Sequence, residues 1–82
     1  MDIKAIKPNQ TLDTRGLACP MPLLKTKKVL KDLGAGEILE VLGTDPGSKN
    51  DIPHFADKGG NKFLGLFDDA EGFTRYFIKK GA

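Results

Sequence analysis

Residues 20–42 read PMPLLKTKKVLKDLGAGEILEVL, a helical pattern followed directly by a strand pattern. Between Pro20 and Leu33 the apolar side chains recur at spacings of three and four residues, which is typical of a helix with one buried face. These apolar positions are Leu23, Thr26 through its methyl group, Val29, Leu30 and Leu33. Gly34 and Gly36 supply the backbone freedom with which helices end. The stretch therefore predicts a helix over residues 20–33.

The strand pattern covers Glu37–Leu42 and alternates between two faces. Leu39 and Val41 share one face, which we expect to lie against the helix, while Ile38 and Leu42 share the other. Exposed aliphatic side chains on that second face would be either a partner surface or a scattered set of the kind that soluble proteins commonly carry. The pattern alone leaves both interpretations open.

Upstream of the helix, Thr11–Thr14 is typical of a short strand, and residues 1–10 form a polar tail. A strand, a helix and a second strand in this order predict two parallel neighbouring strands joined by a right-handed crossover. The chain has 82 residues and 39% hydrophobic content, which is enough for one core. We therefore place a single domain at residues 11–82.

A turn over residues 44–47 leads to a second helix whose start is ambiguous. Ser48 could open it through a Ser-x-x-Asp pattern, but Pro53 would then fall where a backbone donor is needed. Asp51 as the N-cap is the alternative. In both cases the apolar stripe comprises Ile52, Phe55 and Ala56.

The remaining chain, Asn61–Phe67 and Gly72–Lys80, is typical of two strands joined by an acidic turn, most simply an antiparallel hairpin. Its aromatic side chains fit the core of a strand better than a surface on which nucleic-acid bases stack. The complete order is β-α-β-α-β-β. It predicts an α/β two-layer sandwich (α+β), with a four-stranded mixed sheet and two helices on one face.

The composition excludes several classes of protein. The 13 basic and 11 acidic residues give a net charge of +2, which is not the footprint of a strongly basic domain, so we expect no direct DNA binding. One cysteine and one histidine cannot fill a structural zinc site, and we expect neither a metal nor a bound cofactor. No apolar stretch is long enough to span a membrane or to act as a secretory signal. We therefore expect a cytoplasmic protein with a reduced thiol.

The single cysteine, Cys19, directly precedes the predicted helix. The first-turn N–H groups and the positive end of the helix dipole favour a thiolate there. Pro20 and Pro22 stiffen the first turn without loss of hydrogen bonds, so the sulfur would be held at a fixed position. A thiolate attacks a sulfane-sulfur donor, and the persulfide that results is again an anion that these donors stabilise.

Carrier chemistry fits Cys19 better than oxidoreductase chemistry, because the sequence offers no adjacent histidine base and no second cysteine. The structural alternative is a cysteine that serves as a small buried apolar side chain. Its position before the helix and its flanking prolines favour function over that alternative.

Two loops are expected to lie beside Cys19. Arg15 and Gly16 lead into it, and Asp45 follows the second strand. If the first two strands are parallel, both loops lie at the sheet edge where ligands of parallel sheets bind. Asp45 would then either orient a partner or simply stabilise its own turn.

The predicted helix also carries a basic band on its polar side. The band comprises Lys25, Lys27, Lys28 and Lys31, with Arg15 nearby in sequence. Such a band is either a solvated helix face or a surface that docks an acidic partner near the sulfur. We treat these lysines as candidate docking residues.

Several short motifs resemble the TusA/SirA sulfur-carrier family. The resemblance runs from about Thr11 to Lys80, and the Cys-Pro-x-Pro motif joined to a downstream Asp-Pro is its specific part. The matching residues are Leu12-Asp13, Arg15-Gly16-Leu17, Cys19-Pro20-Met21-Pro22, Thr44-Asp45-Pro46-Gly47-Ser48, Asp51-Ile52-Pro53 and Phe77-Ile78-Lys79-Lys80.

The resemblance implies a sandwich similar to the C-terminal domain of translation initiation factor three, with the family's cysteine at Cys19. It further implies a relay protein rather than a stand-alone enzyme, which accepts persulfide sulfur from a cysteine desulfurase or rhodanese-like donor. A downstream acceptor would then use the sulfur in tRNA thiolation, molybdenum cofactor synthesis, sulfur oxidation or, in some branches, selenium metabolism. Two other hypotheses stay open: an RNA-binding module that does not need Cys19, and a regulatory domain whose cysteine senses oxidation.

Overall fold

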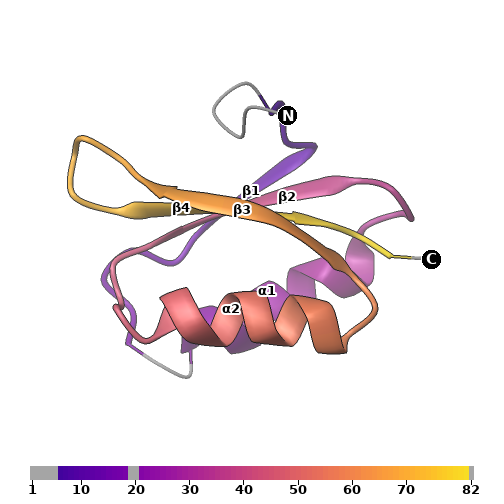
Figure 1. The fold of residues 1–82 in the computed structure, drawn as a ribbon, viewed down its shortest axis with the longest axis horizontal. Coiled ribbons are helices and arrows are strands. Elements are labelled where there is room, and N and C mark those ends of the chain that lie inside the picture. Colours follow the sequence, from indigo (N-terminus) through magenta and orange to yellow (C-terminus); the bar gives the residue numbers. More distant parts are fainter. Residues whose placement is uncertain (1–5, 19–20, 82) are drawn as a thin grey trace.

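The computed structural model describes residues 6–18 and 21–81, and there a four-stranded sheet carries two helices on one face (Figure 1). The strands are β1 (Gln10–Asp13), β2 (Ile38–Gly43), β3 (Lys62–Asp68) and β4 (Thr74–Lys79). The helices are α1 (Met21–Asp32) and α2 (Ser48–Lys58). The predicted order β-α-β-α-β-β and the fold class are confirmed.

The sheet has the strand order β1-β2-β4-β3. β1 runs parallel to β2, as a crossover through α1 requires, and β4 is antiparallel to both of its neighbours. Pairing extends beyond β1 at both ends, because the N–H groups of Asn9 and Thr14 donate to the carbonyls of Ile38 and Leu42, each at 2.8 Å. The loops that leave β1 and β2 therefore lie at the same edge of the sheet.

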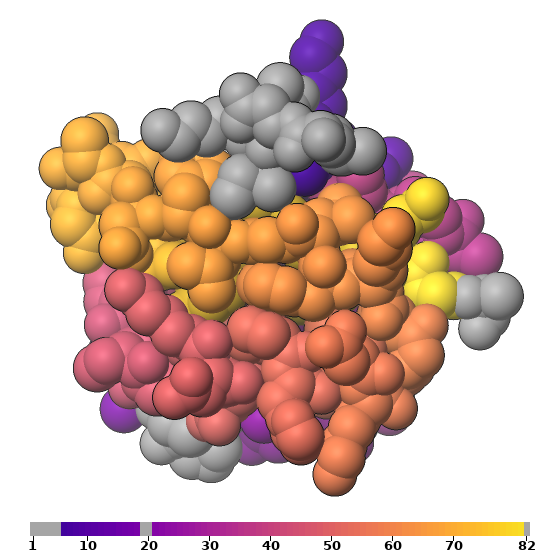
Figure 2. All heavy atoms as spheres, viewed as in Figure 1, coloured from indigo at the N-terminus to yellow at the C-terminus, as the bar shows by residue number. Residues whose placement is uncertain are grey.

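The apolar core lies between the sheet and the helices. Leu39 and Val41 are fully buried there, as their shared face predicted. The core cluster comprises Leu30, Leu39, Val41, Ile52, Ala56, Tyr76 and Ile78. From α1, Thr26 and Leu30 are buried and the other members of the predicted stripe pack against the cluster, so that stripe is confirmed. In the space-filling view α2 and β3 lie side by side and close one side of this core (Figure 2).

Helix α2 begins at Ser48 with Gly47 as its N-cap, so Asp51 is not the cap, and Ser48 is the first helical residue instead. The preceding turn makes this start possible, because its carbonyls accept the first N–H groups. Those of Ser48 and Lys49 donate to Asp45 and Pro46 at 3.2 and 3.3 Å. Pro53 lies inside the helix. Proline has no N–H, and the helix tolerates the loss of this one backbone hydrogen bond.

The sheet face away from the helices is less open than the sequence suggested. Leu42, expected to be exposed there, has only 9% of its surface accessible. Its cross-strand neighbour is Arg75, whose long side chain lies on the same face. On this face Phe77 also stacks on Phe67 with ring centroids 5.9 Å apart. The expectation of exposed aliphatics is therefore wrong for Leu42.

Candidate functional site

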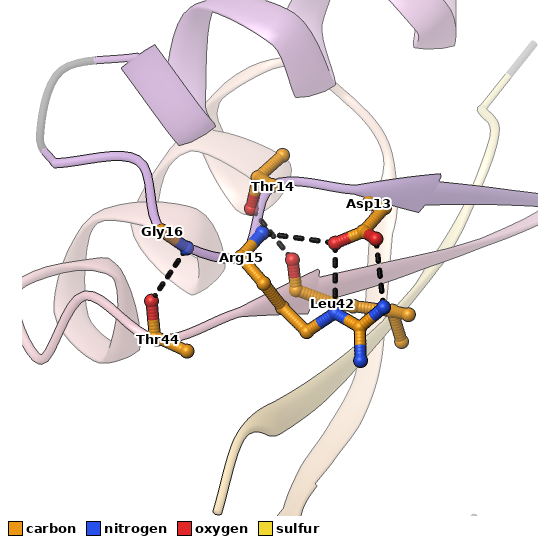
Figure 3. A network of polar contacts seen from close by, with 6 residues as sticks. All are labelled: Asp13, Thr14, Arg15, Gly16, Leu42 and Thr44. Carbon is orange, nitrogen blue, oxygen red and sulfur yellow. Dashed lines mark hydrogen bonds and ion pairs between the residues drawn. The ribbon is translucent and has the colours of Figure 1, made fainter.

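The segment between β1 and α1 is held against the end of β2 (Figure 3). Thr14 is fully buried, and both its N–H and its hydroxyl donate to the carbonyl of Leu42, at 2.8 and 2.6 Å. The N–H of Gly16 donates to the hydroxyl of Thr44 at 2.9 Å. Gly16 has a φ of +83°, a conformation that strains any residue with a side chain. The predicted proximity of the two loops is thus observed for their described residues.

Arg15 is ion-paired with Asp13 rather than free to extend the basic band. Its Nε and Nη2 atoms donate to the two carboxylate oxygens of Asp13 at 2.9 and 2.8 Å, and its backbone N–H donates to Oδ1 at 3.0 Å (Figure 3). These hydrogen bonds from Arg15 lower the pKa of Asp13 to about 2. The pair is therefore fully ionised at neutral pH, and the charge of Arg15 is balanced locally.

The guanidinium of Arg15 also lies over the ring of Phe73, 4.9 Å from its centroid. The guanidinium of Arg75 lies over the same ring, again at 4.9 Å. Arg75 in turn donates from Nε to Asp69 at 2.8 Å and from Nη1 to Glu40 at 3.0 Å. We call this group of side chains the arginine–phenylalanine cluster. It comprises Arg15, Phe73 and Arg75 with the carboxylates of Asp13, Glu40 and Asp69. This cluster was not predicted from the sequence, although the sequence does place an aromatic residue, Phe73, directly after the acidic turn.

Cys19 and Pro20 lie outside the described residues, so the predicted placement of the thiol is not tested. The flanking residues are described: the N–H of Met21 donates to the carbonyl of Ala18 at 3.0 Å, and α1 begins at Met21. Pro22 is buried in the first turn, and its carbonyl accepts the hydroxyl of Thr26 at 2.7 Å. In the sequence, Cys19 therefore stands two residues before the first residue of α1, near the end at which helices carry N–H groups without intrahelical acceptors.

Asp45 stabilises its own turn. Its carboxylate accepts the hydroxyl of Ser48 at 3.2 Å. The same residue lines a cavity of about 250 Å³ between the β2–α2 loop and the β3–β4 turn. Two other lining carboxylates, Asp68 and Asp69, are neutralised by Lys49 and Arg75 at 3.0 and 2.8 Å. The cavity adjoins the loop of Gly16 through Thr44 but presents little unbalanced charge.

The candidate docking lysines, Lys25, Lys27, Lys28 and Lys31, are all exposed on α1. Within residues 6–18 and 21–81 none of them forms an ion pair. Two apolar side chains, Met21 and Leu24, are exposed on the same helix, at 42% and 52%. Leu24 could have been found in the sequence, because it is an apolar residue outside the buried stripe of the helix. Helix α1, which follows Cys19 in the sequence, thus exposes a mixed basic and apolar surface.

Residues 10–80 match the protein family described as sulfurtransferase TusA. The chain belongs to the TusA family. The match runs from β1 to the end of β4, so it includes every element of the arginine–phenylalanine cluster. Within the described part of this TusA-family chain, no helix is long and apolar enough to cross a membrane.

Known relatives of this TusA-family protein include single-domain and longer chains. It is 40% identical over 72 residues to the sulfur carrier protein TusA of Allochromatium vinosum, covering 88% of this chain and 93% of that protein. It is 49% identical over 77 residues to YrkF of Bacillus subtilis, covering 93% of this chain but only 40% of that protein. The solved structure of a SirA-like protein from Desulfitobacterium hafniense matches with a TM-score of 0.79 at 28% identity, over 89% of this chain and 99% of that one. The resemblance found in the sequence is confirmed.

Proposed function

We propose that this TusA-family protein carries sulfane sulfur as a persulfide on Cys19 and relays it between protein partners. The observation that carries the proposal is the position of the chain's single cysteine within the family match. It stands in a Cys-Pro-x-Pro motif whose last two residues, Met21 and Pro22, begin α1. The sulfur is cargo bound covalently to Cys19, so the relay needs no bound cofactor. The proposed place of action is the cytoplasm, where thiols are kept reduced.

The loading step is a thiol exchange in which atoms balance. The Cys19 thiolate attacks the terminal sulfur of a persulfide on the donor, a new sulfur–sulfur bond forms to Cys19, and the donor's sulfur–sulfur bond breaks. The donor cysteine leaves as a thiolate, and the proton on the transferred sulfur stays with it. The N–H groups of the first turn of α1 stabilise the anionic forms of Cys19. Unloading repeats this exchange with the acceptor as the attacking thiolate.

Other residues of the chain have two roles in this relay. Some hold the loop that leads to Cys19, and others dock the protein partners. Arg15 and Gly16 hold the segment before Cys19, Pro20 and Pro22 stiffen the start of α1, and Asp45 stabilises the neighbouring turn. The exposed lysines of α1 attract acidic surfaces, and Met21 and Leu24 add apolar contact area. The proposed donors are a cysteine desulfurase or a rhodanese-like protein. Candidate acceptors are the enzymes of tRNA thiolation, of cofactor synthesis and of sulfur oxidation.

The decisive experiment is intact-mass spectrometry after incubation with a cysteine desulfurase and cysteine. We expect the wild-type protein to gain one sulfur atom that reductant removes, and the Cys19→Ser variant to gain none. Circular dichroism of the variant controls for folding. If the wild-type protein gains no sulfur from several competent donors, the proposal is wrong, and RNA binding or redox sensing becomes the better hypothesis.

Docking through α1 is tested by reversing charge at Lys27 and Lys28. We expect the Lys27→Glu/Lys28→Glu variant to load sulfur more slowly and with weaker dependence on salt, because electrostatic steering of the donor is lost. A matched control is Lys58→Glu/Lys62→Glu, which makes the same change in net charge at exposed positions on α2 and β3. Equal loading rates in the two variants would mean that α1 has no special part in docking.

A further inference from the structure

We infer that Phe73, in the turn between β3 and β4, is a positioning residue that acts through Arg15. What it positions is the segment between β1 and α1, which we call the Cys19 loop. The inference rests on the proposed role of Cys19. Phe73 is far from Arg15 in the sequence, yet its ring faces that guanidinium at 4.9 Å and is itself only 6% exposed. At this separation a guanidinium is attracted to the face of an aromatic ring.

Phe73 has a fixed position because the turn and Arg75 hold it. The N–H of Asp69 donates to the carbonyl of Phe73 at 2.7 Å, and the N–H of Gly72 donates to the carbonyl of Asp69 at 3.0 Å. The ring also meets Arg75, which is fixed by Asp69 and Glu40. Because these contacts hold the ring, Phe73 offers Arg15 a stable surface.

Two guanidinium groups over one ring repel each other. The arrangement persists because each cation has its own carboxylate partners, at 2.8 to 3.0 Å. The side-chain hydrogen bonds with Asp13 raise the pKa of Arg15 above its ordinary value, which outweighs the small opposing effect of the Arg75 charge. The cluster thus joins β1, β2, β4 and the β3–β4 turn to the residue that begins the Cys19 loop.

The loop is consequently held on two sides. Thr44 accepts the N–H of Gly16 at 2.9 Å on the β2 side, and Phe73 faces the neighbouring Arg15 on the turn side. Leu17, Ala18 and Cys19 follow directly in the sequence. Loss of the Phe73 face removes the contact on the turn side and leaves only the Thr44 and Asp13 contacts. We therefore expect the segment that leads to Cys19 to be held less firmly beside the start of α1, where a thiolate is favoured.

The test is the rate at which iodoacetamide alkylates Cys19, followed across pH in Phe73→Leu, Phe73→Tyr and Phe63→Leu. We expect Phe73→Leu to slow alkylation at neutral pH by about two- to fivefold, the size that one cation–π contact allows, and to move the midpoint of the pH profile upward. Phe73→Tyr keeps an aromatic face and restores the wild-type rate. Phe63→Leu is the matched control, because Phe63 is a partly buried aromatic on β3 that pairs with Ile78 instead of facing the loop.

A double-mutant cycle separates positioning from a general loss of stability. We expect Arg15→Gln alone to slow alkylation at least as much as Phe73→Leu, because it also removes the ion pair with Asp13. Phe73→Leu should have no further effect in the Arg15→Gln background. Equal effects of Phe73→Leu in both backgrounds, or an unchanged pH profile in Phe73→Leu, overturn the inference. If Phe73→Leu does not fold, Arg15→Gln against wild type carries the test, and an unchanged rate there overturns it as well.

Alkylation uses the thiol alone and needs no sulfur donor. The two experiments can therefore give different answers. Persulfide loading of the wild-type protein can fail while the double-mutant cycle shows coupling between Phe73 and Arg15, or loading can succeed while the cycle shows no coupling. The first result rejects the proposed function, and the second rejects the positioning role of Phe73.

Discussion

The two faces of the sheet are built from alternate residues of the same strands, yet different forces hold them. On the helix side, Leu39, Val41 and Tyr76 are fully buried in apolar packing. On the other side, Glu40 and Arg75 form a charged pair at 3.0 Å, and Thr11 donates to Glu40 at 3.1 Å. The first face is held by burial of apolar area, whereas the second adds directional contacts to apolar side chains such as Leu42 and Phe77.

This difference separates stability from positioning. Apolar packing is strong but does not depend on direction, whereas a bidentate ion pair or a guanidinium over a ring fixes orientation. The directional contacts include Asp13, Arg15 and Phe73, which lie next to the segment leading to Cys19. The helix face therefore contributes most to the stability of the fold, and the opposite face carries the contacts to which we assign the positioning of the candidate site.

The largest effect on stability should come from a substitution in the core on the helix side of the sheet, at Ile52. This side chain is fully buried in the core, and Ile52→Ala should lower the free energy of unfolding by about 2–5 kcal/mol because it leaves a cavity. The thermal midpoint should fall by about 10 °C or more, as measured by circular dichroism. His54→Ala, at an exposed position on the same helix, is the control and should change little. Equal losses in both variants would contradict this account of the core.

On the opposite face of the sheet, we expect Glu40→Ala to cause a smaller loss of stability. The change removes one partner of Arg75 and the acceptor for the Thr11 hydroxyl, which should cost about 1–3 kcal/mol in urea unfolding. Glu40→Gln keeps the length of the side chain and one acceptor oxygen, so it should recover part of the loss of stability. A cost for Glu40→Ala above that of Ile52→Ala would reverse the comparison of the two faces.

The smallest change is a gain, expected from Tyr76→Phe. The buried hydroxyl of Tyr76 has no hydrogen-bond partner in the described structure, so its removal should stabilise the protein by about 1 kcal/mol, or about 4–8 °C. Thermal melts at neutral pH measure this gain, and a loss would mean that the hydroxyl has a partner.

The same residue predicts how stability changes in alkali. Burial raises the pKa of the Tyr76 phenol above its ordinary value of 10.0. The neutral phenol therefore favours the folded state fully below pH 10, and this contribution decreases as the pH rises above 10. Because the chain has a single tyrosine, phenolate absorbance reports Tyr76 alone. Tyr76→Phe should lack this part of the alkaline decline, and identical declines in both proteins would contradict the prediction.

Much of the fold could be predicted because its signals are local. The apolar spacing of α1 and the alternation in β2 each lie within one element, and the structure confirms both. The start of α2 was less certain, since Ser48, Asp51 and Pro53 gave competing local signals. What decided it was the turn before the helix, whose carbonyls accept the N–H groups of Ser48 and Lys49.

The arrangement around the site could be predicted only in part. Parallel pairing of β1 and β2 correctly indicated that Gly16 and Thr44 meet. The contact between Arg15 and Phe73 could not be predicted, because it depends on how β4 and its turn are placed relative to β1. Leu42 was assigned to the correct face, but its burial depends on Arg75 from another strand. Such contacts join residues far apart in sequence and leave no periodic pattern.

The central position of β4 has a consequence for the synthesis of the protein. β4 is the last strand in the sequence, yet it pairs with both β2 and β3. While the chain is still emerging from the ribosome, β1 and β2 form only a two-stranded pair, which is marginal in water, and β3 has no neighbour. Arg75 is also absent then, so Phe73 lacks one of the contacts that hold its ring beside the β1–α1 loop. Folding of the sheet and ordering of the cysteine's support must therefore occur together, after Thr74–Lys79 have left the ribosome.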